Sequence, residues 1–441
     1  MFSFVFSSQI QHYMKKIVLV FLLASISFVI NANDSTKFSL NNQVVADADN
    51  AGLTLPSGFG ALIAADNLGR ARHIVATKQG GLYVKLERLV GGKGIVYLTD
   101  ANKDGKMEVE TSFGNYIGTG IAIKDNYLYA SSNEDVFRYQ LDENGKVTNP
   151  DNPQRIVKGL WDKRQHASKS IALDNAGNIY VNIGAPSNSC QEVDRTKGSK
   201  GMYPCPILDS AGGIWQFKVD QTDQGYHNGV RYATGLRNVV GLDWNQQQNK
   251  LYVTMHGRDM LYTLYPDMFD TTVSAELPSE TMYEINKGDD AGWPYVYYDH
   301  FQKKKVLSPE YGGDGKKAGG EKAIDPIVAF PAHMAPNALL FYTGNQFPAK
   351  YKNGAFIAFH GSWNRSPLPQ EGYYVVFIPF ENGKPSGQWE VFANGFSGTE
   401  VVKNPRDAKH RPCGLTEGPD GSLYVSDDVK GTIYRIVYNA K

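Results

Sequence analysis

The sequence contains no excess of charge and no long apolar run beyond its N-terminal segment. Its 45 Lys and Arg residues balance 45 Asp and Glu residues, which gives no reason to expect a nucleic-acid partner. No apolar stretch comparable to residues 17–30 follows, so we expect no stable membrane insertion. The Gly-rich residues 311–320 lack the Gly-Lys-Ser/Thr ending of a phosphate-binding loop, and we therefore exclude a nucleotide there.

The N-terminal segment is typical of an export signal. Two lysines after Met14 precede the apolar run, and the chain offers a cleavage point after Ala32. Met14 begins a conventional signal by itself, and no cysteine stands at the cleavage point, which argues against lipid anchoring. We predict a signal peptide at residues 1–32, starting at Met1 or Met14, and a periplasmic or secreted single domain at residues 33–441.

Cysteine is scarce, with three residues in the whole chain. In an oxidising compartment Cys190 and Cys205 are expected to pair across a loop of small and polar residues. Closing a loop of about 15 residues contributes on the order of 3 kcal/mol of stability. Cys413 is then left over, and we interpret it as a buried small apolar side chain in preference to a reactive thiol.

The most frequent pattern in the sequence is a polar turn followed by a short strand with an aromatic residue. Six copies over roughly 400 residues give about 65 residues per repeat, a little above the usual length of a propeller blade. A single four-stranded blade cannot bury both faces, so such blades stack in a ring. The pattern predicts an all-β fold, a six-bladed β-propeller of four-stranded antiparallel blades; a large β-sandwich does not usually repeat one motif six times. The aromatic positions are Tyr83, Tyr129, Tyr180, Tyr252, Phe356 and Tyr424.

Three polar segments stand out because they lie at the ends of predicted inner or second strands. In a propeller these positions are at the mouth of the central channel, where loops build sites. Taken singly, each has an ordinary structural interpretation, such as an exposed His or an Arg in a salt bridge beside a turn Asn. The segments are His166-Ala-Ser-Lys, Gly235-Leu-Arg-Asn and Met255-His-Gly-Arg-Asp.

Together and in this order, the segments resemble the soluble quinoprotein sugar dehydrogenases, the glucose/sorbosone dehydrogenase family of six-bladed propellers that use pyrroloquinoline quinone (PQQ). The resemblance extends from about Gly58 to the C-terminus and is strongest to the sorbosone and pyranose dehydrogenase branch. It implies hydride transfer from C1 of an aldose or pyranose to PQQ, with a cytochrome or a quinone as electron acceptor. Further matching motifs are Ala291-Gly-Trp-Pro-Tyr, residues 335–344, Phe359-His-Gly-Ser-Trp-Asn-Arg-Ser and Ser426-Asp-Asp.

The resemblance also implies roles for individual residues. His166 would be the base that removes the proton of the anomeric hydroxyl, and Arg237 would stabilise the oxyanion of the reduced quinone. Calcium would be held by the backbone carbonyls of Gly257 and Arg258, since oxygen ligands suit a hard cation. PQQ is flat and has three carboxylates, so its pocket needs cations and a planar face. The residues implied to bind it are Arg72, Asn238, His333, Trp363, Asn364, Arg365 and Arg411, with His360 as a further cofactor or substrate contact.

One position departs from the glucose-oxidising relatives, which have an Asp directly after the Ile-Gly of the His-bearing blade. Here that position is Ala185, so the carboxylate that orients the base is missing. The sorbosone and pyranose branch also tends to lack it, and we therefore take the change as a sign of the branch. Ser187 or Asn188 is our candidate for orienting His166 instead. The change argues against glucose itself as the substrate.

Two alternatives to these assignments remain open at the level of sequence. The segment from Asp100 to Gly105 begins like an EF-hand loop, but its twelfth position is Thr111 where the motif needs a Glu, and we favour a hairpin connection. The chain as a whole could instead be a calcium-dependent lactonase on a six-bladed propeller, or a non-catalytic binding propeller. Retention of His166, Arg237, Asn238 and Arg365 together argues against the non-catalytic propeller.

Overall fold

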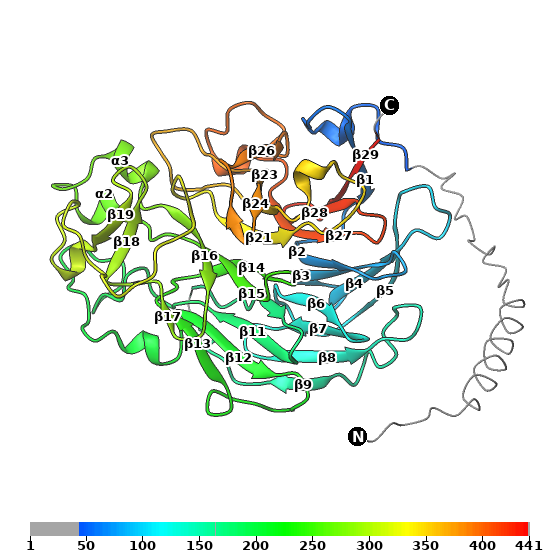
Figure 1. Cartoon of the computed structure of the whole chain (residues 1–441), viewed down its shortest axis with the longest axis horizontal. Helices are drawn as coiled ribbons and strands as arrows, with labels where there is room; N and C mark the ends of the chain where they lie inside the picture. Colours follow the sequence, from blue (N-terminus) through cyan, green and yellow to red (C-terminus); the bar gives the residue numbers. More distant parts are fainter. Residues whose placement is uncertain (1–43, 164, 440–441) are drawn as a thin grey trace, which may run out of the picture. The chain divides into compact units, whose positions relative to one another are not determined.

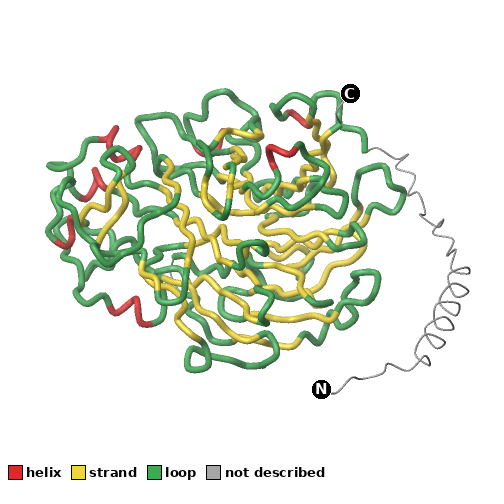
Figure 2. The backbone as a smooth tube through the Cα atoms, viewed as in Figure 1, coloured by secondary structure: helices red, strands yellow, loops and turns green. Residues whose placement is uncertain are grey.

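The computed structural model describes residues 44–163 and 165–439. The predicted signal peptide lies outside these residues, so its boundary stays a prediction. Within the described part of the chain, no helix has the length and apolarity needed to cross a membrane. Strands dominate the backbone, and the few helices are short (Figure 2).

Six sheets of at least four strands form the blades, each named from its inner strand outwards. The first three are β2 (Ala71–Ala76), β3 (Leu82–Val90), β4 (Lys93–Thr99) and β5 (Glu108–Phe113); β6 (Ile121–Lys124), β7 (Tyr127–Ser131), β8 (Val136–Gln140) and β9 (Gln154–Val157); and β10 (Ile171–Leu173), β11 (Asn178–Ile183), β12 (Gly213–Lys218) and β13 (Val230–Thr234), to which β17 (Asp289–Asp290) adds a parallel edge. The other three are β14 (Val239–Asn245), β15 (Lys250–Met255), β16 (Glu280–Ile285) and β20 (Val328–Phe330); β21 (Pro336–Phe341), β22 (Ala355–Phe359), β23 (Tyr374–Ile378) and β26 (Glu390–Ala393); and β27 (Pro412–Glu417), β28 (Leu423–Asp427), β29 (Ile433–Tyr438) and β1 (Phe59–Ala65).

The inner strands close a ring, which confirms the six-bladed β-propeller predicted from the repeats. Each inner strand packs against the next, from β2 through β6, β10, β14 and β21 to β27, and β27 returns to β2. The last blade combines both ends of the domain, because β1 pairs antiparallel with β29 beside it (Figure 1). Pairing of the first and last strands prevents the ring from opening between its first and sixth blades.

The repeated aromatic residues explain why the blades stack. All six lie on the second strand of their blades and are almost completely buried. Tyr180 stacks on Trp244 of the following blade with ring centroids 5.1 Å apart, and the Tyr83 hydroxyl donates a hydrogen bond to the Gly145 carbonyl of its neighbour. Each aromatic residue therefore fills the space between adjacent blades, where a large buried ring with a polar tip stabilises the contact.

The chain between the fourth and fifth repeats includes a group of short elements that lies beside the ring of blades (Figure 1). It contains α2 (Leu261–Leu264), α3 (Thr271–Glu276) and the hairpin of β18 (Val296–Asp299) and β19 (Lys304–Leu307). A smaller hairpin, β24 (Phe380–Glu381) with β25 (Lys384–Pro385), follows β23. The 3-10 helices are η1 (Asn50–Gly52), η2 (Pro206–Asp209), η3 (Pro309–Tyr311), η4 (Ala349–Tyr351) and η5 (Pro405–Asp407).

Three smaller predictions also have an outcome in the fold. Cys190 and Cys205 form the predicted disulfide, with sulfurs 2.00 Å apart. Cys413 is a free, buried thiol, and burial raises its pKa to about 12.

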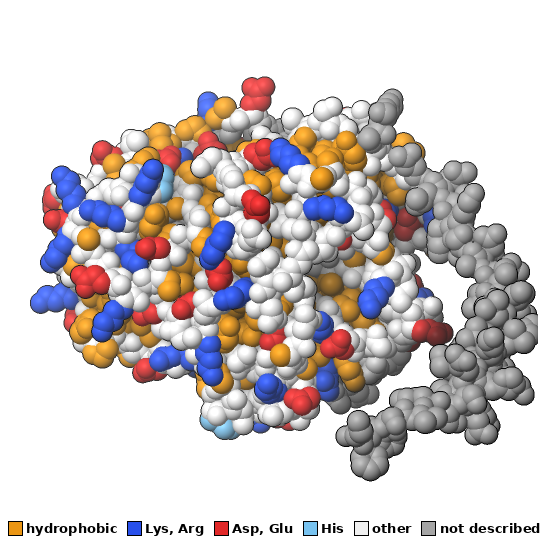
Figure 3. Space-filling model, viewed as in Figure 1, with side chains coloured by type: hydrophobic (Ala, Val, Ile, Leu, Met, Phe, Trp, Pro, Cys, Tyr) orange, Lys and Arg blue, Asp and Glu red, His pale blue; other side chains and the backbone are white. Residues whose placement is uncertain are grey.

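Asp100 accepts hydrogen bonds from the backbone N–H groups of Asp104 and Gly105 in the loop between β4 and β5, which is the expected hairpin connection. Basic and acidic side chains are interspersed on the face seen in Figure 3, in keeping with the balanced composition.

Candidate active site

Polar residues at the first ends of five inner strands line one cavity of about 420 Å³. Arg72 is in β2, His166 precedes β10, Arg237 precedes β14, His333 precedes β21 and Arg411 precedes β27. The inner strands of a propeller run in the same direction, so residues far apart in sequence meet at one end of the channel. The three segments singled out in the sequence therefore share one site.

His166 is held by the backbone at the position of the missing carboxylate. Its Nδ1 lies 2.6 Å from the carbonyl oxygen of Ala185, and its φ of 61° is unusual for a residue other than glycine. A carbonyl only accepts hydrogen bonds, so Nδ1 must carry the proton and Nε2 is left as the basic nitrogen. Burial, and then the charge of Arg237, holds the pKa of His166 well below its usual value. His166 is thus a neutral imidazole across the physiological pH range.

The residues proposed to orient His166 do something else. The Ser187 hydroxyl donates to Asp194, and Asn188 bonds to Arg237 and Asp259, so the expectation that either orients the base is wrong. The backbone replaces a side chain because the two segments are in close contact: a Cβ at Gly184 would lie 2.6 Å from the Cβ of His166. Only glycine at this position lets the Ala185 carbonyl approach the imidazole.

Asp259 joins the cationic side chains on one wall of the cavity. Its Oδ2 lies 3.0 Å from both Arg237 Nη2 and Arg195 Nη2, and its Oδ1 accepts a hydrogen bond of 2.9 Å from Asn364. Burial raises the pKa of Asp259, but Arg237, His333 and Arg195 outweigh it and hold the pKa well below its usual value. Asp259 is therefore an ionised anchor that fixes the direction of Arg237.

The opposite wall also contains basic side chains, but a carboxylate pairs with only some of them. Arg72 and His360 share Asp428, at 2.8 Å and 2.7 Å. Arg411 donates to three backbone carbonyls, those of residues 360–362, and no carboxylate lies within ion-pair distance of it among the described residues. Because carbonyls do not neutralise a guanidinium, Arg411 keeps a full positive charge for an anionic ligand.

A known protein family matches the whole propeller, including every segment that lines the cavity. The sequence profile of the TrAA12-like family matches residues 53–439. The chain belongs to the TrAA12-like family. This TrAA12-like chain is 25% identical over 427 residues to the PQQ-dependent pyranose dehydrogenase of Coprinopsis cinerea, covering 87% of the chain and 54% of the relative. It is 23% identical over 450 residues to the PQQ-dependent sugar dehydrogenase of Hypocrea jecorina, covering 95% of the chain and 96% of the relative.

Other relatives extend the comparison. An uncharacterized protein of Borreliella burgdorferi is 26% identical over 439 residues, covering 97% of each chain. The holo PQQ domain of the Coprinopsis cinerea pyranose dehydrogenase superposes with a TM-score of 0.67 at 21% identity, covering 87% of this chain and 97% of that one. The calcium structure of the Trichoderma reesei family AA12 enzyme gives 0.69 at 20% identity, covering 90% and 99%. The TrAA12-like chain is thus a propeller like the PQQ-dependent sugar dehydrogenases, which confirms the resemblance, and it spans about half the length of the pyranose dehydrogenase.

The cavity of the TrAA12-like chain has the chemistry that PQQ and calcium require. Four buried polar atoms on its lining residues have no hydrogen-bond partner among the described residues. Buried polar atoms in native proteins are usually paired, so these four are available to a polar ligand. The cavity volume also falls in the range of small-molecule sites. The four atoms are His256 Nε2, Glu280 Oε2, Asn337 Oδ1 and Asn364 Oδ1.

The structure brings together most of the residues implied by the resemblance, but not all of them. Arg365 does not line the cavity, because its guanidinium binds Glu276 and the carbonyls of Ala275, Ala332 and Pro369. The side chain of Arg258 also points elsewhere and forms a buried ion pair with Glu310, which leaves only its backbone for a metal. The predicted residues that line the cavity are His166, Arg237, Arg72, Asn238, His333, Trp363, Asn364, Arg411 and Gly257, together with His360.

Several cavity residues were not found from the sequence. Asp259 ended one of the singled-out segments, but its role depends on Arg195, which comes from the disulfide loop. His256 lies in the same segment, but no role was assigned to it, and Glu280 lies in ordinary strand sequence that no local pattern marks. Burial, and then Asp259, raises the pKa of Glu280 to about 8.

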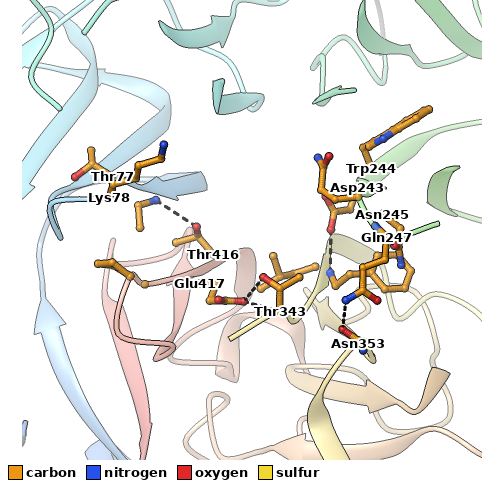
Figure 4. Close-up of a pocket in the computed structure, with 16 residues that line it drawn as sticks. Thr77, Lys78, Asp243, Trp244, Asn245, Gln247, Thr343, Asn353, Thr416 and Glu417 are labelled. Carbon is orange, nitrogen blue, oxygen red and sulfur yellow. Dashed lines mark hydrogen bonds between the residues drawn. The ribbon is translucent and has the colours of Figure 1, made fainter. Parts of the chain in front are cut away.

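A second pocket, of about 410 Å³, lies at the other ends of the inner strands (Figure 4). Its two carboxylates connect blades: Asp243 accepts the backbone N–H of Phe341 at 2.9 Å, and Glu417 accepts that of Thr343 at 2.8 Å. Burial raises the pKa of Asp243 to about 7. These hydrogen bonds explain the carboxylates as links between strands, without any ligand.

Proposed function

We propose that this TrAA12-like protein is a PQQ- and calcium-dependent dehydrogenase that oxidises an aldose or pyranose at C1 in the periplasm or outside the cell. The main support is a neutral His166 whose Nε2 has no hydrogen-bond partner among the described residues, in a cavity that also holds Arg237. A general base must be unprotonated and within reach of the substrate hydroxyl, and an adjacent guanidinium must face the developing negative charge. The export signal predicted from the sequence supports the location.

Different walls of the cavity would hold the two groups. Arg411 and Arg72, with Asn238, would bind the carboxylates of PQQ, and the 60% exposed Trp363 offers a planar face at the rim. The carbonyls of Gly257 and Arg258 would bind calcium. The Gly257 carbonyl already accepts a hydrogen bond of 2.8 Å from Arg237, and its second lone pair leaves room for a cation.

The chain itself orients and moves the proton. His166 Nε2 accepts the proton of the anomeric hydroxyl, while the Ala185 carbonyl keeps the imidazole in the required tautomer. Asp259 holds Arg237 so that its guanidinium stabilises negative charge in the cavity. When bound, PQQ supplies the redox chemistry by accepting the hydride from the sugar carbon.

Titration of the purified protein with PQQ and calcium, followed by dye reduction with a panel of aldoses, tests this function. We expect sugar-dependent dye reduction that requires both additions and is lost on chelation of calcium. His166→Ala should abolish turnover and leave the absorbance titration with PQQ unchanged, and the exposed His227→Ala serves as the matched control. Absence of PQQ binding would refute the proposal, and lactone hydrolysis without quinone would then favour a lactonase.

A further inference from the structure

Glu280 is a cavity carboxylate that the proposed reaction does not use. It begins β16, its residue exposure is 3%, and its Oε2 has no hydrogen-bond partner among the described residues. Burial and then Asp259 raise its pKa, whereas Arg237 and, less strongly, the backbone of Gly257 and His333 favour its charged form. A buried carboxylate oxygen without a partner is costly unless a ligand satisfies it.

The other carboxylate on this wall is already saturated. Asp259 is bound by Arg237, Arg195 and Asn364, and His333 Nδ1 lies 3.5 Å from it. Among the described residues, no basic side-chain nitrogen lies within 4 Å of the Glu280 carboxylate. A cation that enters this part of the cavity would therefore meet a free oxygen at Glu280 and none at Asp259.

The strand register places Glu280 beside the predicted calcium carbonyls. In the β15–β16 ladder Met255 pairs with Thr281, so the chain just after Met255 runs past the residues just before Thr281. The contact is close: a Cβ at Gly257 would lie 2.9 Å from the Pro278 carbonyl oxygen and 3.1 Å from that of Ser279. Gly257 and Glu280 are thus neighbours on adjacent strand ends.

We propose that Glu280 is an anionic ligand of the calcium ion, next to the backbone carbonyls of Gly257 and Arg258. This inference rests on the proposed function, which places calcium at these carbonyls. Two neutral carbonyls alone would bind Ca²⁺ weakly, whereas a carboxylate adds a negative hard oxygen. The protein should then bind calcium without the quinone, and Glu280 should determine that affinity.

Isothermal titration of Ca²⁺ into the chelator-treated, PQQ-free protein tests the proposal. We expect saturable binding by the wild type, at least tenfold weaker binding by Glu280→Gln, and an intermediate affinity for Glu280→Asp, which retains the charge. Asp243→Asn removes a carboxylate at the far end of the channel and should leave calcium binding unchanged. Circular dichroism and thermal melting confirm that each variant is folded.

The outcomes separate this inference from the proposed function. Equal calcium affinity of Glu280→Gln and the wild type, or no calcium binding by the PQQ-free wild type, would refute the role of Glu280. Sugar oxidation by the same wild-type preparation would show that the function stands all the same. Conversely, calcium binding that depends on Glu280 in a protein that never binds PQQ would support the metal ligand and refute the dehydrogenase.

Discussion

Replacing Asp259 by Asn leaves two guanidinium groups in the cavity without their shared carboxylate. The effect on Arg237 is the larger one, because its side chain is only 3% exposed and no second carboxylate lies within ion-pair distance of it among the described residues. Removing one partner of a buried ion pair costs about 3–5 kcal/mol. Arg195 is 27% exposed and reaches solvent, so it adds little. We expect Asp259→Asn to lower the free energy of unfolding by about 3 kcal/mol.

Asp243→Asn is the matched control, because Asp243 accepts one backbone N–H and has no cation partner within ion-pair distance among the described residues. Its pKa is raised from 3.8 to about 7, so its ionisation opposes folding as the pH rises toward 7. The neutral Asn variant should therefore gain about 2.5 kcal/mol of stability relative to the wild type between pH 5 and pH 8. The pKa of Asp259 is instead lowered, so its own stabilisation is lost only in strong acid, and the cost of Asp259→Asn should change between pH 5 and pH 8 only through Glu280, whose pKa Asp259 raises.

Urea unfolding of the PQQ-free protein, followed by tryptophan fluorescence at pH 5 and pH 8, measures both differences. A cost below 1 kcal/mol for Asp259→Asn would show that solvent screens the charge of Arg237, and it would refute the claim that Asp259 holds Arg237 in place.

Three further predictions follow from the structure. Arg411→Lys should weaken PQQ binding at least tenfold by absorbance titration, whereas Arg365→Lys should leave it unchanged, since of these two arginines Arg411 lines the cavity and Arg365 does not. Cys190→Ser opens a loop of 15 residues and should cost about 3 kcal/mol in urea unfolding, with no loss if the loop is held by other contacts alone. Burial lowers the pKa of His256 to about 3 and of His73 to about 4, so protonation of the unfolded chain below pH 6.5 should cost the wild type about 1–2 kcal/mol at pH 5 relative to each His→Gln variant; a difference between wild type and variant that does not change between pH 7 and pH 5 would contradict this.

The propeller was predictable because its signal is periodic. Tyr83, Tyr180 and their counterparts recur in the same local context, and each fills the same space between blades, so a sequence pattern maps directly onto a packing rule. The disulfide was predictable for a similar reason, since two cysteines close together in an oxidising compartment have few alternatives. Because His166 and Arg237 both precede inner strands, the sequence also predicted that they line the same end of the central channel.

The sequence by itself determined the repeat, the ring, and which strand ends form the mouth. Only the tertiary structure decided which groups act there: the carbonyl of Ala185 orients His166, Asp259 meets Arg195 from the disulfide loop, Arg365 turns away from the cavity, and Glu280 lies beside Gly257. The reason is physical. Every residue has a backbone carbonyl, so no residue type marks the one that binds, and contacts between distant loops depend on directions that local sequence patterns do not encode.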